Sequence, residues 1–170
     1  RWFSTLKNGI FYQASESFYS FQMSDGLSNN KINCLSISGG KIVVGTNDSY
    51  INILQGNVIS KVKISDRPNS VIYALEKGIN EKLWIGTNEY LYLYDWEKVS
   101  KYDNNHKYYK TSDINSRKVF NIKDIFSDEN GKLYLGEAAG LSILEDGQVI
   151  YNSFLDDGIE LRVETVTQHG

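Results

Sequence analysis

The hydrophobic residues of this chain fall into short runs separated by polar turns rich in Gly, Asn and Asp. Several runs alternate apolar and polar positions, as in "VISKVKI" (58–64) and "YLYLY" (90–94). A period of two is typical of β-strands. The stretch 71–84 could also form an amphipathic helix, but its relatives elsewhere in the chain contain Gly-Gly and Asn-Gly turns, which favour a hairpin. The pattern therefore predicts an all-β protein.

The runs form a repeating unit. The stretches "KIVVGT" (41–46), "KLWIGT" (82–87) and "KLYLGE" (132–137) share one pattern, with "RWFST" (1–5) as a weaker copy. Their equivalent positions are Ser4, Gly45, Gly86 and Gly136, at spacings of 41, 41 and 50 residues. An apolar segment precedes each stretch and two more follow it, the last expected at 18–22, 58–64, around 107–110 and at 148–154. Four short strands in a unit of this length predict a β-propeller blade.

The repeat frame predicts a β-propeller segment of about four blades, each with four antiparallel strands. The units span approximately 1–27, 28–66, 67–116 and 117–158, with a further first strand within 159–170. The chain opens at what the frame makes a second strand and has no initiator Met, so we expect a mature or excised chain. We expect an arc of a larger ring of about seven blades. A closed four-bladed ring, or two copies joined into an eight-bladed ring, are the alternatives.

Composition narrows the classes of function. The formal net charge of −3 gives no electrostatic reason to expect nucleic acid as a partner. No apolar run approaches the ~20 residues of a membrane span, so we expect no direct membrane contact. The single cysteine, Cys34, excludes an intrachain disulfide and is expected in the core. Only His106 and His169 are present, and no catalytic, metal or cofactor motif stands out, so the chain is expected to be non-catalytic, without a cofactor.

The stretch "GLSNNKINCLSISGGKIVVGTND" (26–48) resembles the two-component regulator propeller repeat, as do 69–95 and 121–147. Ser4, Tyr90 and Glu137 depart from that pattern. The resemblance implies a periplasmic, or more generally extracytoplasmic, sensor domain of a hybrid two-component system histidine kinase. It implies an oligosaccharide ligand, control of polysaccharide utilisation, a kinase elsewhere in the full-length protein and a homodimer. Similar repeats occur in secretion-associated surface proteins. A structural or protein–protein interaction propeller is therefore the alternative.

The third unit is nine residues longer than the others, and the excess falls within 95–116. Insertions in repeat proteins often form the binding face. Aromatic rings can pack against the C–H faces of sugars, and amides can bind hydroxyl groups. The candidate ligand-binding residues are Trp96, Tyr102, Asn104, Asn105, His106, Tyr108 and Tyr109. A solvated linker without a partner explains the insertion equally well. By contrast, Trp84 and the alternating Tyr90, Tyr92 and Tyr94 are expected to pack between blades.

Overall fold

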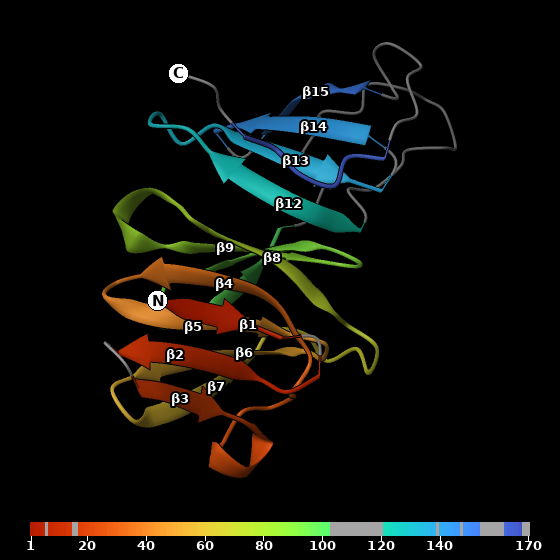
Figure 1. The fold of residues 1–170 in the computed structure, drawn as a ribbon. Coiled ribbons are helices and arrows are strands. Elements are labelled where there is room, and N and C mark those ends of the chain that lie inside the picture. The colour runs from red at the N-terminus through yellow and green to blue at the C-terminus, as the bar shows by residue number, and fades with distance from the viewer. Residues whose placement is uncertain are drawn as a thin grey trace. The chain divides into compact units, whose positions relative to one another are not determined.

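The computed structural model describes residues 1–5, 7–14, 17–102, 121–138, 140–146, 148–153 and 162–167. The chain divides into two compact units, 1–75 and 76–170. In both units the described strands form antiparallel meanders, in which each strand pairs with its neighbour in the sequence (Figure 1). Two short 3-10 helices, η1 (Met23–Asp25) and η2 (Ile79–Glu81), are the only helices longer than one residue among the described residues.

The first unit contains a three-stranded and a four-stranded sheet. The strands are β1 (Trp2–Ser4), β2 (Ile10–Ala14) and β3 (Ser17–Phe21), followed by β4 (Ile32–Ser38), β5 (Lys41–Thr46), β6 (Tyr50–Gln55) and β7 (Val58–Lys63). Gly39 and Gly40 form the two-residue turn between β4 and β5, with φ values of 57° and 69°. Positive φ at both positions suits the strand twist of a tight hairpin and favours glycine. The turn that the sequence predicts at this point is confirmed.

The third sheet begins with β8 (Ile72–Lys77), inside which the boundary between the units falls. It continues with β9 (Leu83–Thr87), β10 (Leu91–Tyr94) and β11 (Val99–Lys101) in the order β11-β10-β9-β8. The fourth sheet contains β12 (Ile122–Ser127), β13 (Leu133–Glu137), β14 (Gly140–Glu145) and β15 (Gln148–Asn152). The hairpin expected within 71–84 is thus formed by β8 and β9, and the one expected within 122–137 by β12 and β13.

The core of the first unit lies between its two sheets. Ile10, Leu27, Ile32, Val44 and Leu54 are buried together, with Trp2, Phe21, Leu35, Ile42 and Ile59 half-buried around them. Gly45, the repeat glycine, leaves no room for a side chain. A Cβ there would lie 2.3 Å from Cys34 Sγ and 2.7 Å from Ile72 Cγ2. Glycine therefore lets the first strand of one sheet approach the second strand of the preceding one, and Cys34 is half-buried at this contact.

The fourth strand of the third sheet differs from the prediction. It lies at 99–101 and not around 107–110. The reason is a tight turn at 95–98, where the Asp95 carboxylate accepts hydrogen bonds from the Glu97 and Lys98 amides. Trp96 adopts a positive φ of 74° in this turn. The sequence "DWEK" contains no Gly or Pro, so the repeat pattern does not predict a turn at this point. The insertion therefore follows β11 and does not precede the fourth strand.

The further first strand expected within 159–170 is not a strand in the described part of that range, 162–167. The segment is nevertheless tied to the fourth sheet, since the Val163 amide donates to Glu137 O at 2.9 Å. The Asp124 carboxylate accepts hydrogen bonds from Thr165 Oγ1 at 2.9 Å and from the Val166 amide at 2.8 Å. A ladder needs a paired neighbour, and no described strand pairs with 162–167.

Candidate functional site

Trp96, the first of the predicted ligand-binding residues, lies in the turn between β10 and β11. Its indole Nε1 donates to the backbone oxygen of Glu81 at 2.7 Å, and its own backbone oxygen accepts from Tyr94 Oη at 3.2 Å. The Tyr94 and Trp96 ring centroids are 5.4 Å apart. These contacts join the β10–β11 turn to the turn between β8 and β9. The indole donor of Trp96 is therefore already used within the third sheet.

Tyr102, the second predicted residue, follows β11 and extends its ladder, because its amide donates to Leu91 O at 2.8 Å. Its ring meets Trp84 edge to face, with centroids 6.5 Å apart. Burial raises the pKa of the Tyr102 phenol. Tyr102 is thus a packing residue of the third sheet and partner of Trp84. The expectation that Trp84 packs is met only in part, since its indole is half-buried.

The structure does not bring Trp96 and Tyr102 together. They lie at opposite ends of β11, six residues apart in the sequence. Trp96 belongs to the turn before β11 and Tyr102 directly follows the strand, so the length of β11 separates them. The other predicted residues, Asn104, Asn105, His106, Tyr108 and Tyr109, lie outside the described residues. Tyr102 is the last described residue before these positions, whereas Trp96 lies before β11.

Tyr92 and Tyr94 of β10, and Tyr90 directly before it, pack as the sequence predicts. Tyr92 and Tyr94 are buried, and Tyr90 meets the Tyr92 ring edge to face at 6.3 Å. The Lys101 ammonium lies 3.6 Å from the Tyr90 ring centroid. Burial raises the pKa of the Tyr94 phenol, and the nearby Asp95 carboxylate adds to the effect. These rings form part of the packed surface of the sheet.

A different feature, in the first unit, forms an open hollow of about 570 Å³. Its lining is provided by the first sheet and by the near end of the second: Trp2, Tyr12, Tyr19, Phe21, Ile42, Leu54, Gly56 and Asn57. Gly56 and Asn57 form the turn between β6 and β7. Four of the eight lining residues are aromatic and none carries a charge.

Three of these rings form a row across the first sheet. Strand pairing places Trp2 opposite Tyr12 and Tyr12 opposite Tyr19. The Trp2 and Tyr12 centroids are 4.6 Å apart and those of Tyr12 and Tyr19 are 6.3 Å apart, both with an interplanar angle of 27°. Phe21 stacks on Trp2 from another side at 6.0 Å. We call Trp2, Tyr12 and Tyr19 the aromatic row.

None of the residues of the aromatic row is among the candidates predicted from the sequence. The signal was present in "RWF" (1–3), "GIFYQ" (9–13) and "SFYSF" (17–21), where aromatic residues fall on strands that the repeat frame pairs. Cross-strand neighbours on one face of a sheet lie within contact distance. Registering the three segments against one another would have placed these rings side by side.

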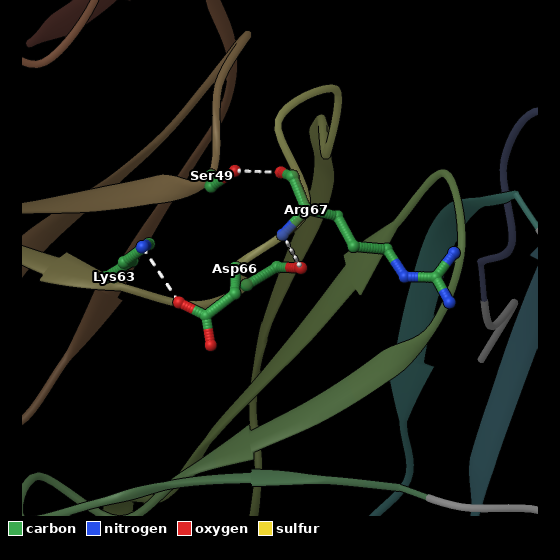
Figure 2. A network of polar contacts seen from close by, with 5 residues as sticks. Ser49, Lys63, Asp66 and Arg67 are labelled. Atoms are coloured by element: carbon green, nitrogen blue, oxygen red, sulfur yellow. Dashed lines mark hydrogen bonds and ion pairs between the residues drawn. The ribbon is translucent and has the colours of Figure 1, made fainter.

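The connector between β7 and β8 is held by polar contacts within itself, to the end of β7 and to the β5–β6 turn (Figure 2). Ser49 Oγ donates to Arg67 O at 2.8 Å, and the Arg67 amide donates to Ser65 Oγ at 3.2 Å. Lys63 and Asp66 form an ion pair at 2.8 Å. Through a hydrogen bond and charge, Lys63 lowers the pKa of the exposed Asp66 carboxyl. These contacts fix the chain between two sheets, and we assign them no ligand.

A second polar cluster joins the connector before β4 to the β5–β6 turn. The Ser28 amide donates to Asn52 Oδ1 at 2.8 Å, and Thr46 Oγ1 lies 3.0 Å from Ser28 Oγ. Asp48 Oδ1 is 2.7 Å from Thr46 Oγ1 and accepts from the Tyr50 amide at 3.0 Å. The atoms satisfy one another, as buried polar groups generally do. This cluster gives the side chains of Ser28 and Thr46 a structural role.

Neither a metal site nor a membrane-spanning helix was found among the described residues. No group of three or more His, Cys, Asp or Glu side chains there is arranged to hold a metal ion. No helix in this part of the chain has the length and apolarity needed to cross a membrane.

The Asn-Gly turn that the sequence predicts between 122 and 137 is confirmed at 127–132, where Asp128 Oδ1 accepts hydrogen bonds from the Asn130 and Lys132 amides.

Comparison with solved structures identifies the class of fold. The chain is similar to the extracellular domain of BT3049 from B. thetaiotaomicron, described as a hybrid two component system, with a TM-score of 0.68 and 21% identity over 93% of this chain and 21% of that one. For the extracellular domain of BT4673 the values are 0.65 and 24%, over 85% and 19%. The chain thus spans about a fifth of the length of these two structures. The predicted fold class, an all-β propeller segment of about four blades, is confirmed.

The same fold also occurs in an enzyme. A virginiamycin B lyase from Staphylococcus aureus matches with a TM-score of 0.65 and 16% identity, over 87% of this chain and 50% of that one. At these identities the likenesses establish the fold alone. No protein-family model and no curated protein matches the chain. The predicted absence of catalysis therefore stays a prediction.

Proposed function

We propose that the chain is a ligand-sensing segment of an extracytoplasmic propeller, part of a hybrid two-component sensor histidine kinase that recognises oligosaccharides and regulates polysaccharide utilisation. The observation that carries this proposal is the propeller fold shared, over 93% of the chain, with the extracellular domain of BT3049. The resemblance of 26–48, 69–95 and 121–147 to two-component regulator propeller repeats supports it from the sequence.

In this proposal the chain binds and does not transform its ligand. A sensor acts because the ligand stabilises one arrangement of the protein over another. Two sensor copies would provide those arrangements by packing together in different ways, as the predicted homodimer implies. The kinase and the output domains belong to the rest of the protein. The chain contributes the recognition surface and the rigid sheets that hold it.

A panel of oligosaccharides tests the proposal directly. A ligand that binds the folded state raises the midpoint of thermal unfolding, and the rise grows with the logarithm of the ligand concentration relative to its dissociation constant. We expect at least one oligosaccharide to raise the midpoint and to give saturable heat in titration calorimetry. The ligand should be recovered unchanged after long incubation, as judged by chromatography. Cleavage or elimination would contradict the non-catalytic part of the proposal.

A deletion tests the site predicted from the sequence. Removing 103–109 leaves β11 and Tyr102 in place, and it removes Asn104, Asn105, His106, Tyr108 and Tyr109. If these residues bind the oligosaccharide, the deletion abolishes the thermal shift without changing the unliganded midpoint. Trp96→Phe tests separately the candidate residue that lies at the other end of β11. If no oligosaccharide binds the intact chain and a protein partner does, the interaction propeller replaces the sensor.

A further inference from the structure

We propose that the hollow above the aromatic row is a binding site for an uncharged oligosaccharide, with a sugar ring held against Tyr12 and Tyr19. This inference rests on the proposed function and adds to it a site in the first unit. It differs from the site predicted at 96–109, which belongs to the third sheet and the segment after it. Four observations support it: size, lining chemistry, accessibility and the departure of these residues from the repeat.

The size suits a small ligand. The hollow measures about 570 Å³, and pockets for small molecules typically span ~300–1,000 Å³. It opens at the end of the second sheet where the β6–β7 turn lies. A Cβ added at Gly56 would meet no atom within 4 Å, so this side of the hollow is open space. A chain of linked sugars could therefore enter without displacing the turn.

The lining chemistry selects an uncharged, amphipathic ligand. Four aromatic residues, Ile42 and Leu54 supply apolar surface. The polar groups are the phenols of Tyr12 and Tyr19, the Trp2 indole N–H and the Asn57 amide. A charged ligand enclosed here would find no opposite charge in the lining, and an unpaired charge is costly to desolvate. A sugar ring presents a C–H face to the aromatic rings and hydroxyl groups to the phenols and the amide.

The aromatic row is accessible. Tyr19 is 55% exposed, although exposed positions of a strand seldom need a large aromatic ring for stability. Tyr12 and Trp2 are half-buried beside it. The row therefore passes from the packed core at Trp2 to solvent at Tyr19. The exposed end of the row can therefore contact a sugar ring without any strand having to unfold.

The row departs from the repeat at two of its three positions. Strand pairing places aliphatic residues where the first sheet has Tyr12: Ile53, Leu93 and Ile143. At the position of Tyr19, the second and third sheets have Ser60 and Ser100, and only the fourth has a tyrosine, Tyr151. The blade fold therefore does not require the two tyrosines, and ligand contact gives them a role.

Titration calorimetry with substituted chains tests this site. The neutral probes are maltohexaose, cellohexaose, xylohexaose and mannohexaose, and pentagalacturonic acid is the charged one. We expect a neutral probe to bind. Tyr19→Ala and Asn57→Ala should each weaken binding about tenfold, since both delete a contact and leave the core unchanged. The matched control is Phe3→Ala, which removes a 45% exposed ring from the opposite face of β1 and should leave affinity unchanged.

Fluorescence gives an independent measurement that does not alter the hollow. In a Trp84→Phe, Trp96→Phe chain, Trp2 is the only remaining tryptophan. Saturable quenching or a spectral shift with the same dissociation constant as calorimetry would support binding beside Trp2.

The outcomes separate this inference from the proposed function. If a neutral probe binds with unchanged affinity to both the Tyr19→Ala and the Asn57→Ala chains, the hollow is overturned as the site while oligosaccharide sensing stands. Binding of only the charged probe also overturns the hollow and not the sensing role. If no probe binds, and a wider glycan panel gives no thermal shift, the proposed function fails and the inference fails with it.

Discussion

The first and third sheets each have a tryptophan in contact with a second aromatic ring at equivalent positions, but the surroundings of the two pairs differ. In the first sheet Trp2 stacks on Phe21 at 6.0 Å, and in the third Trp84 meets Tyr102 at 6.5 Å. Trp2 and Trp84 each lie two positions before the repeat Ser or Gly. Phe21 pairs with Ile10, and Tyr102 donates to the equivalent Leu91. The two pairs thus occupy equivalent positions of the repeat in these two sheets.

The difference comes from the residues across the strand. Opposite Trp2 stand Tyr12 and then Tyr19, which continue the stack to solvent beside an open hollow. Opposite Trp84 stand Leu93 and then Ser100, which end it. Trp84 lies against Gly78 instead, where a Cβ would be 2.8 Å from Nε1. One repeat position can therefore serve packing in one blade and surround a cavity in another. The cross-strand partners decide which.

The largest expected effect is the loss of the third-sheet indole. Trp84→Ala should lower the free energy of unfolding by about 2–3 kcal/mol, somewhat less than the ~3–5 kcal/mol of a fully buried aromatic ring, because Trp84 is half-buried. Trp2→Ala should cost about 1–2 kcal/mol, because one side of Trp2 already borders a hollow. Urea unfolding followed by circular dichroism measures both. A larger loss for Trp2→Ala would contradict the contrast between the packed and the open pair.

The glycine beneath Trp84 provides the next test. Gly78→Ala should cost about 1–3 kcal/mol, since the new methyl group would overlap the indole and force it to move. The effect should largely disappear in a Trp84→Ala background, where the obstacle is gone. The Trp84 emission maximum should shift in the single variant. Equal costs in both backgrounds would show that the backbone at 78, and not the indole, resists the methyl group.

The sequence predicted the repeat and the structural consequences that depend on the repeat alone. Gly45 and Gly136 recur because each lies on the second strand of a blade, close to the segment that follows that blade. Gly45 lies close to Ile72, and Gly136 close to Val163 and Val166. In both cases a Cβ would collide with residues of that strand or segment. Period-two alternation likewise predicted that Tyr92 and Tyr94 are buried. These features depend on local pattern and on register, both visible in one sequence.

The sequence did not predict features that depend on side chains meeting across strands or on unusual turns. The 95–98 turn uses the Asp95 carboxylate and a positive φ at Trp96 in place of glycine, so Asp95 is its only sequence signal and the stronger Gly or Pro signal is absent. Without that turn, the fourth strand is predicted around 107–110 instead of 99–101, and Trp96 is grouped with the insertion. The sequence does not predict the hollow, because its lining comes from two sheets. Whether the space between two sheets is filled depends on packing in three dimensions.

A half-buried carboxyl further distinguishes the third-sheet region from the uncharged hollow. Burial raises the pKa of Glu76 above its ordinary value of 4.5, and Asp124 adds to this, while the Ser127 amide opposes it with a 3.1 Å hydrogen bond. Because the folded pKa exceeds the unfolded one, Glu76 contributes stability that is fully present below pH 4.5 and is lost as the pH rises through the folded value.

Glu76→Gln checks this sign. Glutamine keeps an oxygen for the Ser127 amide and cannot ionise, so the variant should match the parent in acid and be the more stable at neutral pH. Thermal midpoints measured across the range from pH 4 to pH 8, with Glu129→Gln as an exposed control, give the comparison. A parent chain that gains stability relative to the Glu76 variant as the pH rises would reverse the assignment.

The smallest expected effect concerns the Lys101 ammonium above the Tyr90 ring. The lining of the hollow in the first unit contains no charged residue and so has no such contact. Lys101→Met removes the ammonium 3.6 Å from the ring centroid and keeps an unbranched side chain. An exposed cation–π contact contributes about 0.5–1 kcal/mol, so the variant should be less stable by that amount. Tyr90→Leu completes a double-mutant cycle, in which the coupling between the two positions is the quantity of interest. Coupling near zero would mean that Lys101 merely lies above the ring. A measurable coupling would show that a charge stabilises the packed third sheet, whereas the row on the first sheet leaves its rings available to a neutral ligand.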